Sequence, residues 1–198
     1  METRDSVNAI PRSELAPATS RAIARYTWQA MLLHWVLAVL VIGMLSLGYW
    51  LGEVPRDTPG RAFYVNLHKS LGVLALMLVL LRLGWRMNHR PPPFPSSMPR
   101  WQMRAASVNH GLLYLCILLQ PLSGYLASAF SKNGVQFFGI PLPQWAWDDK
   151  PLRSFFADIH GMVPVALLVL ISIHVLAALK HLLVDRDQVF QRMLPGKK

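Results

Sequence analysis

Histidines are the residues of this 198-residue sequence whose type and position could do chemistry, because several of its seven lie in long apolar stretches. Two lie well inside such stretches and three within the first turns of theirs: His34 and His174, then His68, His110 and His160. An ionisable group at membrane depth costs free energy and marks a functional site by default. A neutral imidazole that ligates a metal meets this cost, because its ring is uncharged and its lone pair is used.

The spacing of the two histidines in the last apolar stretch predicts more than one site. His160 and His174 are 14 residues apart. At about 100° and 1.5 Å per residue of a helix, they share nearly one face and lie about 21 Å apart along the axis. One mononuclear site cannot span that distance, so we expect two sites near opposite surfaces of the membrane.

The apolar stretches around these histidines predict the fold. Hydrophobic residues make up 53% of the sequence and charged residues only 15%, whereas a soluble domain has about a quarter charged residues. About 20 apolar residues cross the hydrocarbon, and lipid offers the backbone no hydrogen-bond partners, so each stretch must be helical. We expect an all-α, integral membrane four-helix bundle with helices at about 28–51, 64–85, 107–130 and 155–184.

The positions of the basic residues predict the orientation. In a soluble protein the net charge of +10 would suggest a nucleic-acid partner. Here the basic residues gather before the first helix, between the second and third, and at the chain end. By the positive-inside rule these segments, and both termini, are cytoplasmic. We therefore expect the lipid bilayer as a partner, no nucleic acid, and a disordered tail over 1–24 before a membrane domain over 25–198.

Depth in the membrane then pairs the histidines. His34 lies about two turns in from the cytoplasmic end of its helix, and His174 about two turns from the cytoplasmic exit of the last. His68 and His160 both lie near the outer face. The pairs His34–His174 and His68–His160 follow, and two imidazoles facing across a bundle core can clamp a haem iron axially. Depth alone leaves His110 as a competitor at the inner site.

Short motifs in a fixed order carry a resemblance to a known family. They are Leu33-His34-Trp35, His68-Lys69-Ser70-x-Gly72, Leu81-Arg82-x-x-Trp85-Arg86, Pro121-Leu122-Ser123-Gly124-Tyr125, Phe137-Phe138-Gly139, Ile159-His160, His174-x-x-Ala177-Ala178-Leu179-Lys180-His181 and the closing Arg186-Asp187 with Arg192-Met193-Leu194-Pro195. Over roughly residues 25–196 the chain resembles the prokaryotic cytochrome b561 family of four-helix dihaem membrane cytochromes. It departs from the pattern at Gly161, where many members have an acidic residue.

The resemblance implies cofactors, ligands and partners. The family's haem ligands fall on His34, His68, His160 and His174, and His110 drops out of the ligand set. The family implies two bis-histidine b haems, a multi-pass place in the bacterial inner membrane, and exchange of electrons with quinone. Some members are similar to superoxide oxidases that reduce ubiquinone. The chain is therefore expected to be an electron carrier or an oxidoreductase acting on superoxide and ubiquinone, with superoxide or a redox protein as donor.

Several other side chains are candidates for contacts with these ligands. Arg82 is deep enough to need a partner, which a haem propionate could supply as a bidentate charge pair; snorkelling to the headgroups is the alternative. Lys69, Lys132 and Arg153 near the outer face could attract an anionic donor such as superoxide. His181 is expected at the inner interface, beside a quinone or a haem propionate in one interpretation.

Three other functions compete with this interpretation. The chain could be the cytochrome b subunit of a larger hydrogenase or dehydrogenase complex. It could instead be a haem-free intramembrane metal-binding protein, although the carboxylates that usually accompany such sites are almost missing from the apolar stretches. It could also be a structural membrane protein whose histidines hydrogen-bond between helices. The single cysteine, Cys116, excludes a disulfide framework and a thiolate metal cluster.

Overall fold

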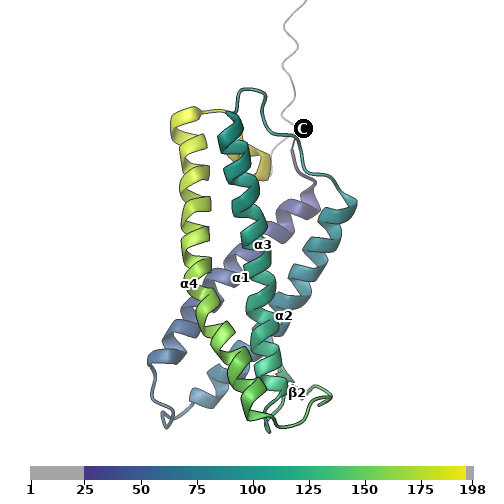
Figure 1. Ribbon diagram of the computed structural model, residues 1–198, viewed down its shortest axis with the longest axis vertical. Coiled ribbons are helices and arrows are strands. Elements are labelled where there is room, and N and C mark those ends of the chain that lie inside the picture. The colour runs from purple at the N-terminus through teal and green to yellow at the C-terminus, as the bar shows by residue number, and fades with distance from the viewer. Residues whose placement is uncertain (1–24, 195–198) are drawn as a thin grey trace, which may run out of the picture.

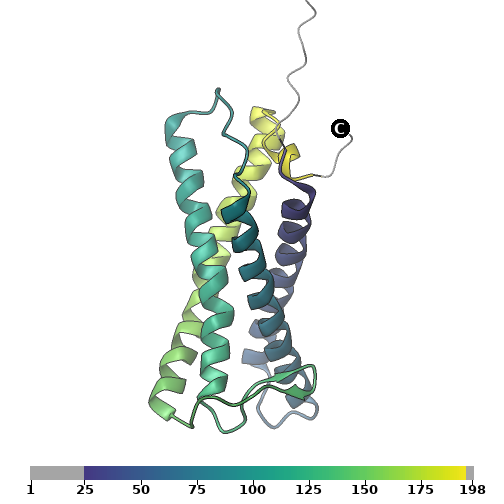
Figure 2. The same cartoon turned by 90° about the vertical axis from the view of Figure 1, so that its right-hand side faces the viewer.

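Four long helices make up most of this computed structural model, which describes residues 25–194. They are α1 (Trp28–Glu53), α2 (Arg61–Asn88), α3 (Arg100–Ala129) and α4 (Lys150–Lys180). Figures 1 and 2 show an elongated bundle in which each helix runs antiparallel to the one before it. Within the described residues these four helices are long and apolar enough to cross a membrane, which confirms the predicted helical membrane bundle. The tail expected over 1–24 lies outside the described residues.

The helices extend beyond the apolar stretches that predicted them. α3 begins at Arg100 rather than near residue 107, and α4 at Lys150 rather than near 155. The Asp149 side chain accepts a hydrogen bond from the backbone N–H of Leu152 at 3.0 Å, and Pro151 occupies the first turn. Both features start a helix locally, whatever its hydropathy. Polar turns outside the hydrocarbon are therefore helical too, and a search for apolar residues does not detect them.

The bundle exposes large apolar side chains and buries small ones. Val39, Val165 and Leu176 are each more than 60% exposed. The buried positions in the helices are few and mostly small, among them Ser70, Ala75, Val79, Ser123 and Leu167. This is the reverse of a soluble core. It suits helices that associate by close packing in lipid, where burying apolar surface gives no driving force.

Helices that are consecutive in the chain pack against each other, and α4 has a second, less closely packed interface with α1 and α2. α1 lies along α2, α2 against α3, and α3 along α4, whereas the backbone of α4 approaches α1 and α2 at few points. Across that boundary the histidine rings of α4 reach those of α1 and α2. The histidine pairs thus lie in this less closely packed interface of α4, where side chains rather than backbones meet.

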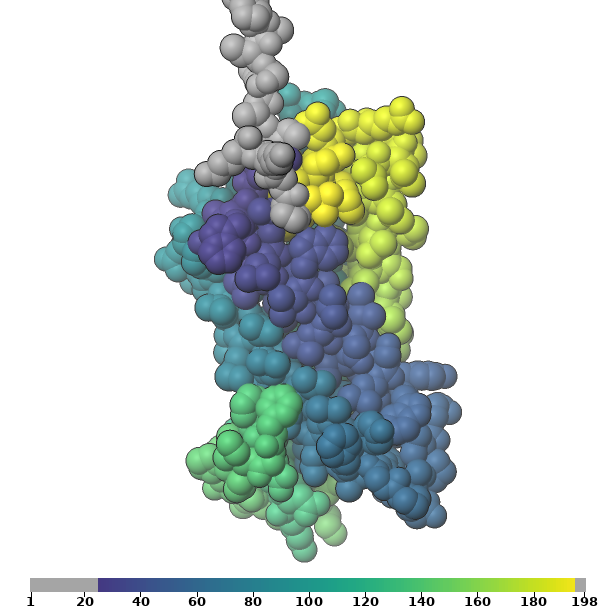
Figure 3. Space-filling model, turned by 180° about the vertical axis from the view of Figure 1, so that it is seen from behind, coloured from purple at the N-terminus to yellow at the C-terminus, as the bar shows by residue number. Residues whose placement is uncertain are grey.

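Both ends of the described chain lie at the same end of the bundle. After α4 the chain forms a π-helical turn, η2 (His181–Asp185), and a 3-10 turn, η3 (Phe190–Met193). The backbone N–H of Tyr26 donates to the carbonyl of Arg192 at 3.3 Å, and the indole N–H of Trp35 donates to the carbonyl of Met193 at 2.8 Å. Figure 3 shows the last described residues, in yellow, beside the purple start of α1. We name this the terminal end of the bundle.

A small hairpin closes the opposite end. Strands β1 (Gln136–Phe137) and β2 (Ile140–Pro141) pair antiparallel, with Gln136 opposite Pro141. Phe138 has φ 48° and Gly139 φ 87° at the turn. The backbone N–H of Phe138 donates to the Ser70 hydroxyl at 2.9 Å, which ties the hairpin to α2. The predicted helices left this segment only as the connection between about residues 130 and 155. The hairpin fixes the first turns of α2, where His68 lies.

Candidate functional site

The structure brings the four predicted histidines together as two pairs. The ring centroids of His34 and His174 lie 6.1 Å apart, and those of His68 and His160 lie 6.0 Å apart. All four rings are half-buried. His34 and His174 come from α1 and α4 toward the terminal end, so we name this pair the inner site. His68 and His160 come from α2 and α4 near the hairpin and form the outer site.

Glycines make room for both rings of the outer site. A Cβ atom at Gly124 of α3 would lie 2.7 Å from Cε1 of His160, closer than real Cβ contacts come. A Cβ at Gly48 of α1 would lie 3.3 Å from Cε1 of His68, which is also tight. The two helices that supply no histidine to this site therefore supply the space around it.

The hydrogen bonds of His160 fix which nitrogen carries the proton. Its Nδ1 lies 2.8 Å from the carbonyl oxygen of Gln120, which can only accept, so Nδ1 is the N–H donor. The side-chain amide of Gln120 donates to Nε2 at 3.4 Å, so Nε2 carries the lone pair and a metal ligated there would replace this amide contact. A carbonyl that holds Nδ1–H and orients the ring is the usual support of a metal-ligating histidine. Nδ1 of His68 is buried without a partner.

The inner site contains a third histidine and an arginine. The His110 ring of α3 lies 5.3 Å from that of His174, closer than His34 does. Arg82 of α2 donates to Nδ1 of His34 at 3.3 Å and to the carbonyl of Ala30 at 3.0 Å. Because Arg82 donates to Nδ1, the proton of neutral His34 is on Nε2. Ligation of iron through Nε2 therefore requires that the Arg82 contact be released.

The spacing of the rings distinguishes the pairs. A metal–imidazole bond is about 2 Å long and the ring centroid lies roughly 1.1 Å behind the nitrogen, so two axial imidazoles have centroids about 6.2 Å apart. The His34–His174 and His68–His160 separations of 6.1 and 6.0 Å agree with this value. The 5.3 Å between His110 and His174 is too short. The residues present therefore fit a bis-histidine haem at each site.

Comparison with known proteins decides the family. A family model described as "Prokaryotic cytochrome b561" matches residues 25–196, nearly the whole chain. This chain belongs to the prokaryotic cytochrome b561 family. It is therefore a membrane electron-transfer cytochrome, and its family membership implies binding of haem b.

Two relatives from Escherichia coli (strain K12) cover most of this cytochrome b561 chain. Cytochrome b561 homolog 2 is 33% identical over 172 residues, which are 86% of this chain and 91% of the relative. Cytochrome b561 homolog 1 is 26% identical over 88% of this chain and 99% of its own length. A probable superoxide oxidase CybB from Yersinia pestis is 25% identical over 88% of this chain and 98% of its own. The four-helix domain is thus shared along its full length.

The basic residues predicted at the outer face of this cytochrome b561 have different surroundings. The Lys69 ammonium is half-buried and donates to the carbonyl of Gly134 at 3.3 Å. Lys132 lies 4.0 Å from a carboxylate oxygen of Asp148 and its side chain is 81% exposed. Arg153 is exposed and near enough to Lys69 for the two charges to interact. Lys69 and Arg153 therefore add to each other's field, whereas Asp148 offsets Lys132.

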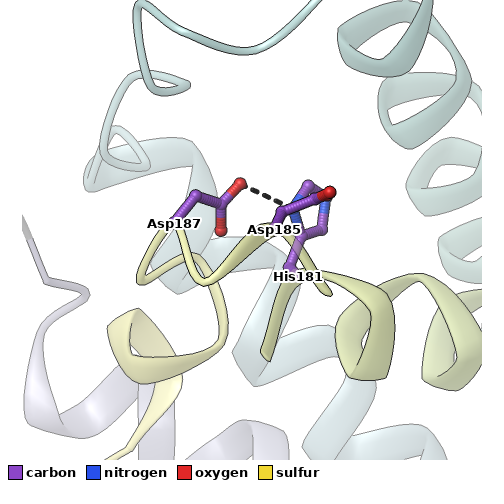
Figure 4. Close-up of side chains that lie close together, drawn as sticks. All are labelled: His181, Asp185 and Asp187. Carbon is purple, nitrogen blue, oxygen red and sulfur yellow. Dashed lines mark hydrogen bonds and ion pairs between the residues drawn. The ribbon is translucent and has the colours of Figure 1, made fainter. Parts of the chain in front are cut away.

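His181 belongs to a separate cluster at the terminal end. Its Nδ1 donates to Asp187 at 2.6 Å and lies 3.2 Å from Asp185 (Figure 4). The ligand atoms of these three residues lie within 4.8 Å of one another, so a cation could be held there. Lys180 already forms an ion pair with Asp185. The arrangement is therefore better suited to a histidine that exchanges protons, with Asp187 orienting its ring.

The sequence analysis did not single out Gln120, and it named Asp187 only as part of the Arg186-Asp187 motif, without a role. Gln120 holds His160, and Asp187 holds His181. An amide inside an apolar stretch, such as Gln120 in α3, is a signal that could have been used, because an unpaired polar group is costly in lipid.

Proposed function

We propose that this cytochrome carries two b haems, with His34 and His174 as axial ligands at the inner site and His68 and His160 at the outer site. The observation that carries the proposal is the near-equal ring separation of the two pairs, 6.1 and 6.0 Å. Each haem, when bound, supplies a one-electron carrier. Held by these two imidazoles, each haem would supply outer-sphere electron transfer.

The two sites form a relay across the membrane. His160 and His174 lie on nearly one face of α4, about 21 Å apart along its axis. We propose that the terminal end faces the cytoplasm of a bacterium, with the helices in the inner membrane, because the basic residues gather at that end. Electrons then pass between an outer donor and an inner acceptor, or the reverse.

Quinone is the proposed partner at the inner site. Reduction of a quinone to quinol takes two electrons and two protons. Because little water is present in the membrane, the protons are harder to deliver than the electrons. His181 follows His174 by seven residues, so the two lie on nearly one helix face, about 10.5 Å apart along the axis. Its Nδ1–H is held by Asp187, which leaves Nε2 to exchange a proton with the ligand and the aqueous phase.

Superoxide is a second proposed substrate, as donor at the outer site. The Yersinia pestis relative is named a probable superoxide oxidase. Lys69 and Arg153 provide the positive charge that would attract a small anion toward that site. A cytochrome that takes one electron from each superoxide and gives two to ubiquinone would be an enzyme as well as an electron carrier.

The experiment that tests this function uses the full-length, haem-loaded protein in lipid nanodiscs. The protein is reduced anaerobically and mixed with a short-chain ubiquinone while the haem absorption is followed. We expect reoxidation, with one quinol formed for every two electrons lost. A protein that is reoxidised by ferricyanide but not by ubiquinone would contradict the quinone assignment. Reoxidation only after a co-purifying subunit is restored would instead favour the subunit of a larger dehydrogenase.

A further inference from the structure

An arginine-rich pocket lies at the terminal end between α1, α2 and α3. Four guanidinium groups line it, those of Arg25, Arg82, Arg86 and Arg90, together with the rings of Trp85 and Tyr114. Its volume is about 70 Å³. Since one water-sized atom needs roughly 10–15 Å³ of such space, the pocket has room for about five to seven of them, enough for a phosphate group.

The positive charge of this pocket has no counter-charge in the described chain. Among residues 25–194, none of the four arginines forms an ion pair with a carboxylate. The acidic side chains after α4, Asp185 and Asp187, are bonded to Lys180 and His181. Nη1 of Arg25 is buried and has no hydrogen-bond partner. Arg25 thus places a buried donor beside the exposed guanidinium groups of Arg86 and Arg90, a combination that an anion at the headgroup level could bind.

The arginines are held in place by neutral neighbours. Arg82 and Arg86, one turn apart on α2, lie over the Tyr114 ring at 5.8 and 5.2 Å from its centroid. The indole N–H of Trp85 donates to the Thr27 hydroxyl at 3.0 Å and fastens α2 to α1 at the pocket. Cation–π contacts orient a guanidinium but leave its charge in place. These contacts therefore orient two of the four guanidinium groups and leave both of them charged.

Haem carboxylates do not account for the whole cluster. Arg82 is the member that reaches the inner site, through His34. Arg86 lies about 6 Å further along α2, and Arg90 lies beyond the end of that helix. One haem has two carboxylates, so at most two of the four charges could be met by it. At least two guanidinium groups at the level of the helix ends, those of the exposed Arg86 and Arg90, are therefore available to another anion.

The surroundings point to a lipid as the source of that anion. The pocket lies at the ends of membrane-spanning helices, where headgroups lie. Leu81 and Trp28, which adjoin the lining residues Arg82 and Thr27 in the sequence, are 56% and 65% exposed, so apolar side chains that acyl chains can contact lie on the same helices. Basic pockets between transmembrane helices commonly bind anionic headgroups. We propose that this pocket binds the phosphate of one anionic phospholipid, such as phosphatidylglycerol.

The test compares two double variants of the haem-loaded, full-length protein. The pocket variant carries Arg86→Gln and Arg90→Gln. The control carries Arg100→Gln and Arg104→Gln, which remove the same charge from exposed positions of α3 at the same end, outside this pocket. Native mass spectrometry counts the phosphatidylglycerol retained, with phosphatidylcholine and inorganic phosphate as comparison ligands. Haem absorption measures cofactor content in each sample.

The proposal expects about one phosphatidylglycerol per wild-type chain and per control chain, and at least tenfold weaker binding by the pocket variant with haem content unchanged. Equal loss in both variants, or in neither, would overturn it. Loss of haem with lipid retained would assign the arginines to the haem carboxylates instead. Displacement of the lipid by equimolar inorganic phosphate would mean a site for free anions and would equally overturn the proposal.

Discussion

Nδ1 of His160 lies 2.8 Å from the backbone carbonyl oxygen of Gln120, across the α3–α4 interface. This contact sets the tautomer of the ring and leaves the lone pair on Nε2, where the Gln120 side-chain amide donates to it at 3.4 Å. Because the carbonyl belongs to the backbone of the best-packed helix pair, the orientation does not depend on a flexible side chain. The outer site is therefore preorganised for a ligand at Nε2. We expect substitutions on α3 to affect the outer site more than the inner site.

Replacement of Gly124 by alanine should disturb the outer site. The new methyl group would lie 2.7 Å from the His160 ring, so the ring or the helix must move. Overpacking of this kind costs about 1–3 kcal/mol, and we expect loss of most of the outer haem. Gly111→Ala is the matched control, because nothing lies within 4 Å of its Cβ position on the same helix. Haem content of the two purified variants checks this; equal contents would contradict it.

Neutralisation of Arg82 should make the inner haem harder to reduce. A positive charge near iron stabilises the added electron, and at roughly 10 Å and an effective dielectric constant of about 20 its removal lowers the midpoint potential on the order of 70 mV. A spectroscopic redox titration of Arg82→Gln measures the shift. Arg100→Gln, at an exposed position of α3, should shift it far less. A potential that stays the same or rises in Arg82→Gln would exclude the proposed contact between this arginine and the inner haem.

The sequence could predict the helices and the depth of the histidines, because both depend on which residues tolerate lipid. Depth alone paired His34 with His174 and His68 with His160, and these rings face each other in the structure. Depth could not separate His34 from His110, since both enter from the terminal end. The family resemblance favoured His34, and the distances from each ring to that of His174, 6.1 Å for His34 and 5.3 Å for His110, now distinguish them on geometry.

Other features depend on packing that a single sequence does not contain. The Gln120 contact requires that α3 and α4 lie at one particular register. The hairpin at 136–141 depends on a hydroxyl, that of Ser70, some 66 residues away in the chain. The polar first turns of α3 and α4 were not predicted, because hydropathy indicates which residues lie in the membrane and not where a helix begins.

Loss of His181 should slow quinone reduction without removing haem. A positioned general acid contributes about 10²- to 10⁴-fold to a proton transfer, and proton transfer limits only part of the reaction, so we expect roughly a tenfold to hundredfold fall in His181→Ala. Asp187→Asn should behave similarly, because it no longer orients the ring. His89→Ala, an exposed histidine at the same end, is the control. Reoxidation by ferricyanide should be unchanged in all three; a slowing there too would mean general damage.

Charge at the outer face should control the reaction with superoxide. Lys69→Gln with Arg153→Gln removes two charges that reinforce each other, so the second-order rate should fall several-fold and depend less on salt. Lys132→Gln alone should have a smaller effect, because Asp148 already offsets that charge. Pulse radiolysis with haem absorption as readout measures these rates. Unchanged kinetics after neutralising all three residues would remove the attraction hypothesis.

The most direct test counts haem per chain in protein purified from haem-replete cells, from a dithionite-reduced minus oxidised spectrum. The account predicts about two b haems for the wild type, one for His174→Ala with the outer haem retained, and two for His110→Ala. A colourless preparation, or a His174→Ala protein that keeps both haems while His110→Ala loses one, would contradict the assignment of His34–His174 and His68–His160 as the two ligand pairs.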